Sequence, residues 1–283
     1  MIRQRLASRS WRCPIAIAVA TAIICLAAPA FSAENAPSVD TIVDNALRIN
    51  YYNGTDGRAS VEMTITDKQG RERNRSLIIL RRDMMSENDT DENFIGDQKF
   101  YVYFRRPADV RGMSFMVWKH TDSDDDRWLY LPDLDLVKRI ASSEERTSFV
   151  GSHFFYEDVS GRNKNEDTHE LVETTDNYYV LKSTPKDPGN VEFAYYKMWI
   201  HKASFVVTQT KYYDQNDKVY REYKVLNVEN IQGFPTVIRS QMTDQRMGGH
   251  TIINYSNVTY NTGLPDNIFT ERYLRKPPIQ YMR

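Results

Sequence analysis

The sequence predicts a mostly β protein: a curved antiparallel sheet of about eleven strands, forming an incomplete, half β-barrel whose concave face is covered by short helices. Two observations predict it. β-Branched and aromatic residues, including 18 tyrosines, outnumber good helix formers through most of the chain. From residue 59 onward, apolar and polar residues alternate with period two between turn-forming clusters. A sheet this long must curl to bury its apolar face.

One helix precedes the strands. Residues 39–50 place apolar side chains at helical spacing, with Ser38 as the expected N-cap. The alternating runs that predict strands are residues 59–66, 73–82, 98–106, 113–120, 127–131, 169–175, 178–184, 193–201, 205–213, 219–229, 236–243 and 251–260. Residues 83–96 are polar and predict a loop, and residues 266–274 allow a short helix. No repeat or linker divides the pattern, so we expect a single domain over residues 34–283.

The first 33 residues have the composition of a secretory signal peptide. Four arginines precede an apolar run, small residues follow it, and the run is short for a membrane span. We therefore expect export to the periplasm, with cleavage near residues 30–33. Both cysteines, Cys13 and Cys25, belong to this leader, so the mature chain would contain no disulfide.

The segment at residues 128–162 is the centre of the pattern. A strand ends at Pro132, a basic turn at Lys138 and Arg139 follows, and an aromatic cluster comes after a serine-rich stretch. Large aromatic residues packed this densely in a loop predict a plug that inserts into the sheet. The acidic pair Glu157 and Asp158 would cap a helix or pair with Arg139 or Arg146. Structural pairing is favoured, with a lid latch as the functional alternative.

Aromatic and methionine side chains of the strands and plug are the candidate ligand-binding residues. Each is either core or the wall of a cavity for acyl chains, to which flexible thioethers are suited. The predicted cavity and lid residues are Phe104, Phe115, Met116, Trp118, Trp128, Phe149, Phe154, Phe155, Tyr156 and Trp199.

Other functions find little support in the sequence. The mature chain is mildly acidic, which argues against nucleic acid. Residues 122–126 are acidic at alternate positions, but Arg127 stands where a calcium loop needs glycine, so no metal or cofactor is predicted. No nucleophile elbow or zinc motif is present, and no catalytic residue is assigned. His153, near the acidic pair, would be the first candidate if the protein were an enzyme.

Five motifs resemble the outer-membrane lipoprotein-sorting protein family, whose members are similar to the periplasmic carrier LolA. They are Trp128-Leu129-Tyr130-Leu131-Pro132, Lys138-Arg139-Ile140, Ser148-Phe149-Val150-Gly151-Ser152, Phe155-Tyr156-Glu157-Asp158 and Leu264-Pro265-Asp266-Asn267-Ile268-Phe269-Thr270. The resemblance covers nearly all of the mature chain. Ser152 and His153 depart from it, since family members often have Thr and Asp at these places.

The resemblance implies a LolA/LolB-like half-barrel around a hydrophobic cavity that shields lipid or lipoprotein acyl chains. It also implies a partner, an inner-membrane transporter of the resistance-nodulation-division (RND) type, and at most transient contact with a membrane. The expected function is therefore a non-enzymatic carrier. The alternatives are a structural or adaptor subunit of an envelope transporter, with its interior filled by its own side chains, and, less favoured, an exported lipid hydrolase.

Overall fold

The structure, a computed structural model, describes residues 37–86, 89 and 94–283. The predicted signal peptide, including Cys13 and Cys25, lies outside the described residues, as does part of the predicted loop at residues 83–96. In the described part, none of the helices combines the length and the apolar composition that crossing a membrane requires.

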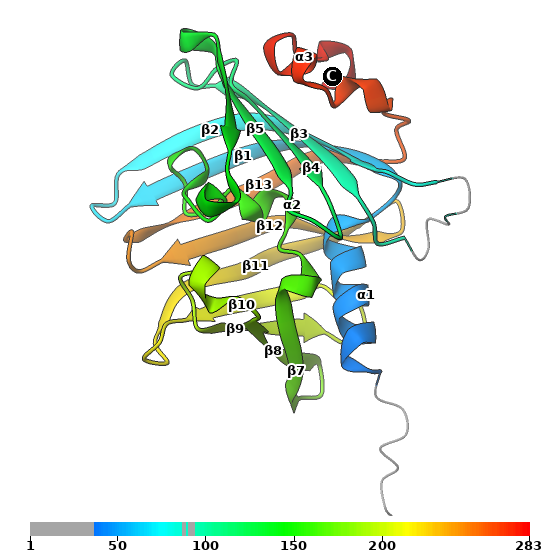
Figure 1. Ribbon diagram of the computed structural model, residues 1–283, viewed down its shortest axis with the longest axis vertical. Helices are drawn as coiled ribbons and strands as arrows, with labels where there is room; N and C mark the ends of the chain where they lie inside the picture. The colour runs from blue at the N-terminus through cyan, green and yellow to red at the C-terminus, as the bar shows by residue number, and fades with distance from the viewer. Residues whose placement is uncertain (1–36, 87–88, 90–93) are drawn as a thin grey trace, which may run out of the picture. The chain divides into compact units, whose positions relative to one another are not determined.

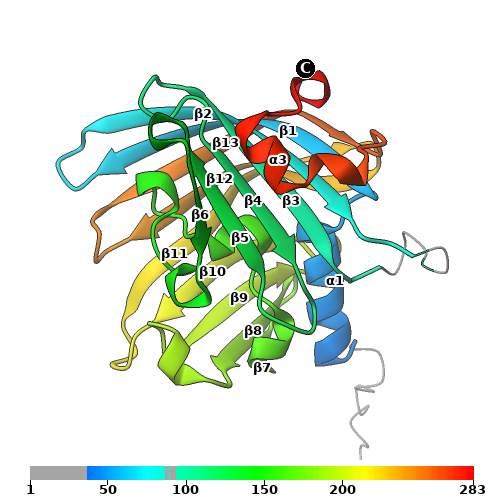
Figure 2. The same cartoon turned by 45° about the horizontal axis from the view of Figure 1, so that its top comes forward.

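The described residues form one large antiparallel sheet that does not close into a barrel, as Figures 1 and 2 show. Its thirteen strands are β1 (Asp56–Asp67), β2 (Glu72–Asp83), β3 (Gln98–Arg106), β4 (Ser114–Lys119), β5 (Asp126–Leu131), β6 (Leu136–Ile140), β7 (Asp167–Thr174), β8 (Tyr178–Pro185), β9 (Tyr195–His201), β10 (Val207–Tyr213), β11 (Val219–Ile231), β12 (Phe234–Asp244) and β13 (Gly249–Tyr260). The predicted mostly β class and open, curved sheet are confirmed.

Few helices accompany the sheet. The α-helices are α1 (Val39–Tyr51), α2 (Glu157–Ser160) and α3 (Glu271–Arg275). The 3-10 turns are η2 (Pro132–Leu134), η3 (Ser142–Glu144), η4 (Phe149–Gly151), η5 (Lys164–Glu166), η6 (Pro188–Asn190), η7 (Asp266–Ile268) and η8 (Ile279–Tyr281). The Ser38 hydroxyl accepts from the Thr41 amide at 3.1 Å, so the predicted N-cap of α1 is confirmed.

The strand order is β6-β5-β4-β3-β2-β1-β13-β12-β11-β10-β9-β8-β7. Every neighbouring pair is consecutive in sequence except β1 and β13, which meet inside the sheet. The chain therefore builds one half from β1 outward to β6 and the other from the far edge at β7 back to β13. Residues 141–166 join the two edges, and in Figure 1 this green segment, with α2, crosses the concave side of the sheet.

One local prediction was wrong. Lys138 and Arg139 do not form a turn but belong to β6, which pairs with β5 and is the edge strand of the sheet. The turn comes earlier, at η2, where Asp135 adopts a left-handed φ of 43°. Charged residues on an edge strand discourage pairing with another chain, which explains a basic sequence at this place.

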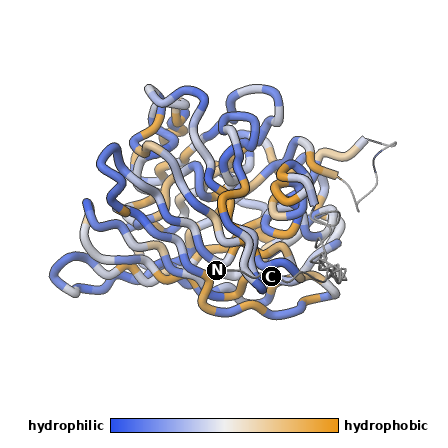
Figure 3. Tube along the Cα trace, turned by 90° about the horizontal axis from the view of Figure 1, so that it is seen from below, coloured by the Kyte–Doolittle hydropathy of each residue, from blue (hydrophilic) through white to orange (hydrophobic). Residues whose placement is uncertain are grey.

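The two faces of the β2–β5 half bury different partners. Inward-facing residues such as Val102 and Phe115 form one core cluster with the plug, which we define as residues 148–161. Outward-facing residues such as Tyr101 and Met116 pack beneath the C-terminal segment, where Phe269 and Leu274 are fully buried. The same segment appears in red over β3 to β5 in Figure 2, and Figure 3 colours many hairpin tips hydrophilic.

Helix α1 lies against β7 and β12 and is fastened at its C-terminal end. The buried Arg81 guanidinium donates to the carbonyl oxygens of Tyr51, Asn53 and Gly54 at 2.7, 2.8 and 2.5 Å. It also pairs with Asp83 at 2.8 Å. A cation at a helix C-terminus satisfies carbonyl groups that the helix itself leaves without donors. Arg81 thereby attaches the C-terminal end of α1 to β2.

Replacing Arg81 with Met is expected to lower the free energy of unfolding by about 3 kcal/mol, because the carbonyl oxygens of Asn53 and Gly54 lose this donor and the buried Asp83 carboxylate loses its counter-ion. Urea denaturation measures this loss. Arg71→Met is the control, since Arg71 is 76% exposed in its pair with Asp67 and its removal should cost less than about 1 kcal/mol. Equal losses in the two variants would contradict the anchoring role.

Candidate ligand cavity

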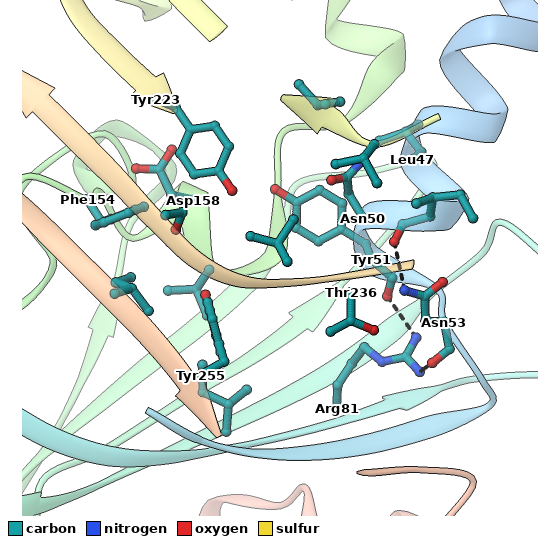
Figure 4. Close-up of a pocket in the computed structure, with 18 of the residues that line it drawn as sticks. Leu47, Asn50, Tyr51, Asn53, Arg81, Phe154, Asp158, Tyr223, Thr236 and Tyr255 are labelled. Atoms are coloured by element: carbon teal, nitrogen blue, oxygen red, sulfur yellow. Dashed lines mark hydrogen bonds between the residues drawn. The ribbon is translucent and has the colours of Figure 1, made fainter. Parts of the chain in front are cut away.

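A cavity of about 380 Å³ lies between the concave face of the sheet, α1 and the plug. Its volume is within the range of roughly 300–1,000 Å³ typical of small-molecule sites. Much of its wall is apolar. The apolar lining includes Val43, Ala46, Leu47, Val61, Met63, Leu77, Ile79, Phe100, Val102, Phe149, Phe154, Val159, Met198, Met242 and Ile253. The close-up in Figure 4 shows side chains of α1, the plug and several strands converging on this space.

The wall formed by α1 follows from its sequence. Val43, Ala46 and Leu47 are spaced by three and four residues and share one face of the helix. All three line the cavity, and Val43 and Ala46 also belong to the cluster that packs α1 onto Leu181 and Ile200. The helix stripe is therefore partly core and partly cavity wall.

Phe149 packs the plug against the concave face of the sheet. The ring of Phe149 lies 5.7 Å from that of Phe104, 5.4 Å from Phe115 and 5.5 Å from Tyr156. Tilted and edge-on arrangements at such distances are favourable for aromatic pairs. Gly151 follows with a left-handed φ of 76°, which turns the chain as predicted. The plug fills the β3–β4 side of the concave face and leaves the cavity beside it.

Buried ion pairs hold the plug. Glu157 pairs with Arg146 and with Arg162, the latter at 2.9 Å. Asp158 pairs with Arg221, which is completely buried on β11 and also donates to the carbonyl oxygen of His153 at 3.1 Å. The Arg221 guanidinium lies 3.8 Å from the ring centre of Phe155, close enough for a cation–π contact. One strand arginine thus fixes three plug residues.

Glu157, which is buried, and Glu145, which is half-buried, have opposite pKa shifts. Burial alone would raise the pKa of Glu157, but the charges of Arg146 and Arg162 outweigh it and hold the pKa below its ordinary value. Burial raises the pKa of Glu145 to about 7; Arg127 opposes this shift, and Glu157 and Glu166 add to it. A carboxyl group in this position changes charge near neutral pH.

Glu145, Glu157 and Glu166 bring carboxylate oxygens within 4.8 Å of one another. Such a group could ligate a hard cation, but each carboxylate already pairs with an arginine, Glu145 with Arg127 and Glu166 with Arg162, both at 2.6 Å. The arginines supply the positive charge that a cation would supply. We therefore assign no metal to the cluster.

His153 is buried in the plug with both ring nitrogens in use. Nε2 lies 3.2 Å from the Gly248 carbonyl oxygen, which can only accept, so Nε2 carries the proton. Nδ1 then accepts from the Thr251 hydroxyl at 2.8 Å. Burial lowers the pKa of His153, which favours this neutral form. The ring positions the plug on β13, and neither nitrogen is left to act on a substrate.

The predicted cavity and lid residues lie in five different surroundings. Phe149 and Phe154 line the cavity. Phe104 and Phe115 belong to the core behind the plug, Tyr156 is the plug residue that packs into that core, and Phe155 lies against Arg221. The prediction was wrong for Met116, Trp118 and Trp128, which do not face the cavity. They lie on the opposite side of the sheet beneath the C-terminal segment, where the Trp118 indole donates to the Phe269 carbonyl at 2.9 Å. Trp199 is not a lining residue either: it faces away from the cavity-lining Met198, beside Lys211.

The predicted latch is corrected in part. Arg146 does pair with Glu157, whereas Arg139 pairs with Asp126 on the surface and reaches neither acidic residue of the plug. The partner of Asp158 is Arg221, which the sequence analysis missed. The wall of α1 was also missed, although its apolar stripe was recognised. Nothing in the local sequence distinguishes Arg221 from a surface arginine.

Replacing Arg221 with Met is expected to lower the free energy of unfolding by about 3 kcal/mol, because Asp158, whose side chain is 14% exposed, loses its counter-ion. Amide hydrogen exchange across residues 148–161 should accelerate in the same variant. The matched control is Arg239→Met on the exposed side of β12, with an expected change of roughly 0.5 kcal/mol or less. Unchanged exchange in the plug would show that Arg221 does not hold it.

Glu145→Gln is expected to gain stability relative to the unsubstituted protein as the pH rises. The pKa of Glu145 is about 7 in the folded state against an ordinary value of 4.5, so the folded carboxyl binds more protons between these values and its ionisation destabilises the fold. Urea denaturation at about pH 5 and about pH 8 measures the difference between the two proteins. Glu229→Gln, an exposed position on β11, controls for the substitution. A pH-independent difference for Glu145→Gln would refute the shift.

Comparison with known proteins supplies the family. A family model described as an uncharacterized protein matches residues 96–276, more than half of the chain. None of the curated proteins compared with the chain matches it. Solved structures do match.

Three of these structures cover most of the chain. A DUF1329 family protein from Desulfovibrio piger has a TM-score of 0.73 at 28% identity, over 84% of this chain and 100% of that one. A putative outer membrane lipoprotein-sorting protein domain from Vibrio parahaemolyticus has a TM-score of 0.72 at 26% identity, over 83% and 97%. A LolA superfamily protein from Nitrosomonas europaea has a TM-score of 0.62 at 21% identity, over 84% and 100%, and this match shows the shared fold.

With its open antiparallel sheet, its plugged concave face and these matches, the chain belongs to the LolA-like family.

Proposed function

We propose that the mature chain, residues 34–283, is a periplasmic carrier that binds acyl chains of lipid or lipoprotein and acts without catalysis. The observation that carries the proposal is the apolar cavity of about 380 Å³ enclosed by the sheet, α1 and the plug. The signal peptide expected at residues 1–33 would export the protein. The lipoprotein-sorting description of the Vibrio parahaemolyticus structure supports the same cargo class.

The physical task of such a carrier is to keep hydrocarbon out of water. Each methylene that leaves water for an apolar wall contributes about 0.8 kcal/mol. In the proposed complex, Phe149, Phe154 and Val159 supply the plug side of that wall, and Val43, Ala46 and Leu47 supply the helix side. The acyl chain of the cargo would lie between these two sides of the wall, along the strands.

Release needs the wall to move, because an interior that protects the cargo also retains it. The plug is the segment we propose to move, since it is not part of the sheet ladder and is held mainly by Arg146, Arg162 and Arg221. Opening would expose the cavity toward an acceptor. An inner-membrane transporter of the RND type is the proposed partner, as the family resemblance implies, with transient membrane contact at most.

The cavity favours the carrier over the alternatives. An adaptor that fills its interior with its own side chains would leave no such space between α1 and the sheet. The hydrolase would need a free base in the plug, and both ring nitrogens of His153 are already bonded.

Binding of fluorescent fatty acyl probes of increasing length tests the proposal. Affinity should rise about fourfold for each added methylene and level off once the cavity is full, because only buried methylenes contribute. Native mass spectrometry of protein from a bacterial periplasm should show a lipid mass that is lost on unfolding. An apo mass together with no uptake of any probe would contradict the carrier function.

Ala59→Trp places a large side chain in the cavity and should lower the affinity for every probe at least tenfold without unfolding the protein. Ala108→Trp, in the exposed loop after β3, is the matched control and should bind as the unsubstituted protein does. If the two variants bound the probes with equal affinity, the probes would not bind in this cavity.

A further inference from the structure

Three tyrosines face the cavity from three different elements. Tyr51 ends α1, Tyr223 lies on β11, and Tyr255 lies on β13. We call them the tyrosine cluster. In Figure 4 the hydroxyl groups of Tyr51 and Tyr223 point toward one another, and that of Tyr255 points into the same space. A wall that is otherwise largely apolar thus carries phenol oxygens in one place.

Two of these hydroxyls have no protein partner. Over the part of the chain that the structure describes, no side-chain or backbone group bonds to the hydroxyl of Tyr51 or Tyr255, while Ser240 lies near the hydroxyl of Tyr223. Two buried tyrosines do have protein partners: Tyr196 donates to Asp167 at 2.7 Å, and Tyr220 to Glu192 at 2.9 Å. Tyr51 and Tyr255 are only half-buried, and their hydroxyls open onto the cavity. A ligand that covers these hydroxyls must bond to them, because removing a hydroxyl from water without a partner is costly.

The cluster is uncharged at neutral pH. Burial raises the pKa of Tyr223 to about 12 and raises the pKa of Tyr51 and Tyr255 as well. The charged groups near it already have partners. Asp158 pairs with Arg221, and Arg81 donates to the carbonyl groups at the end of α1. Lys119, whose Nζ lies 5.5 Å from the centre of the Tyr51 ring, donates to the carbonyl oxygens of Ser160 and Gly161 at 2.6 and 2.8 Å, and Arg162 and Lys164, which also line the cavity, pair with Asp167 and Asp44. The cluster therefore offers neutral O–H donors, and the cations named here are already bonded.

We propose that the tyrosine cluster binds an uncharged carbonyl oxygen of the ligand, the ester or amide group at the head of an acyl chain. A carbonyl accepts from the two free hydroxyls while its chain lies against the apolar wall. A plain hydrocarbon would leave those hydroxyls unpaired, and an ionised carboxylate would lose its water without meeting a cation that lacks a partner. This inference rests on the proposed carrier function and narrows its substrate class.

Competition against a bound fluorescent acyl probe tests the inference with two ligands of equal length, methyl hexadecanoate and octadecane. The variant is Tyr51→Phe/Tyr255→Phe, which removes the two free hydroxyls and keeps the rings. Affinity for the ester should fall about threefold to tenfold for each hydrogen bond lost, while affinity for the alkane stays the same or rises. The difference between the ligands isolates the hydrogen bonds from packing.

Tyr103→Phe on the outer face of β3 removes a hydroxyl far from the cavity and should change neither affinity. The single variant Tyr255→Phe keeps the test valid if the double variant does not fold. An equal loss for ester and alkane, or no loss for either, would overturn the carbonyl site and leave the carrier function standing. If the unsubstituted protein bound neither ligand, the carrier function itself would fail, and this inference with it.

Discussion

The connection between the two edges of the sheet is the constraint on which the rest of the structure depends. Because β1 and β13 pair inside the sheet, β6 and β7 become opposite edges, and residues 141–166 must travel from one to the other. A segment that crosses the concave face cannot join the strand ladder, so its polar groups need other partners. The arginines and His153 supply these partners, and the aromatic rings of the plug supply the apolar contact.

The same crossing divides the concave face into a filled part and an open part. Phe149 and Tyr156 fill the side over β3 and β4, so β2 to β4 have an ordinary core there. On the other side, α1 is fixed by Arg81 and spans the strands without filling the space beneath it. The cavity is therefore a consequence of how the plug and α1 share one curved face, since each covers only part of it.

Periodicity in the sequence predicted the strands but could not assign their faces. In β3 and β4, residues of both faces are apolar, so Phe115 and Met116 look equally suited to a cavity. The C-terminal segment decides between them by covering the face of Met116, and that contact joins residues far apart in sequence. The ion pairs of the plug show the same limit. Glu157 pairs with Arg146, eleven positions away, and this pair was predicted, whereas Asp158 pairs with Arg221 on β11, far along the chain, and this pair was missed. The strand β6 was missed because its basic residues look like a turn.

In the proposed carrier, the cavity provides affinity for the cargo and the plug limits its release. Apolar walls bind any hydrocarbon of suitable size, so they give affinity with little discrimination. The buried ion pairs make the plug costly to displace, since an unpaired buried charge destabilises a protein by about 3–5 kcal/mol. A plug held in this way opens rarely by itself, at populations of roughly one in a hundred or less. An acceptor that offers new partners to Arg146 or Arg221 would reduce that cost, and cargo transfer would then follow contact with the acceptor, not diffusion through water.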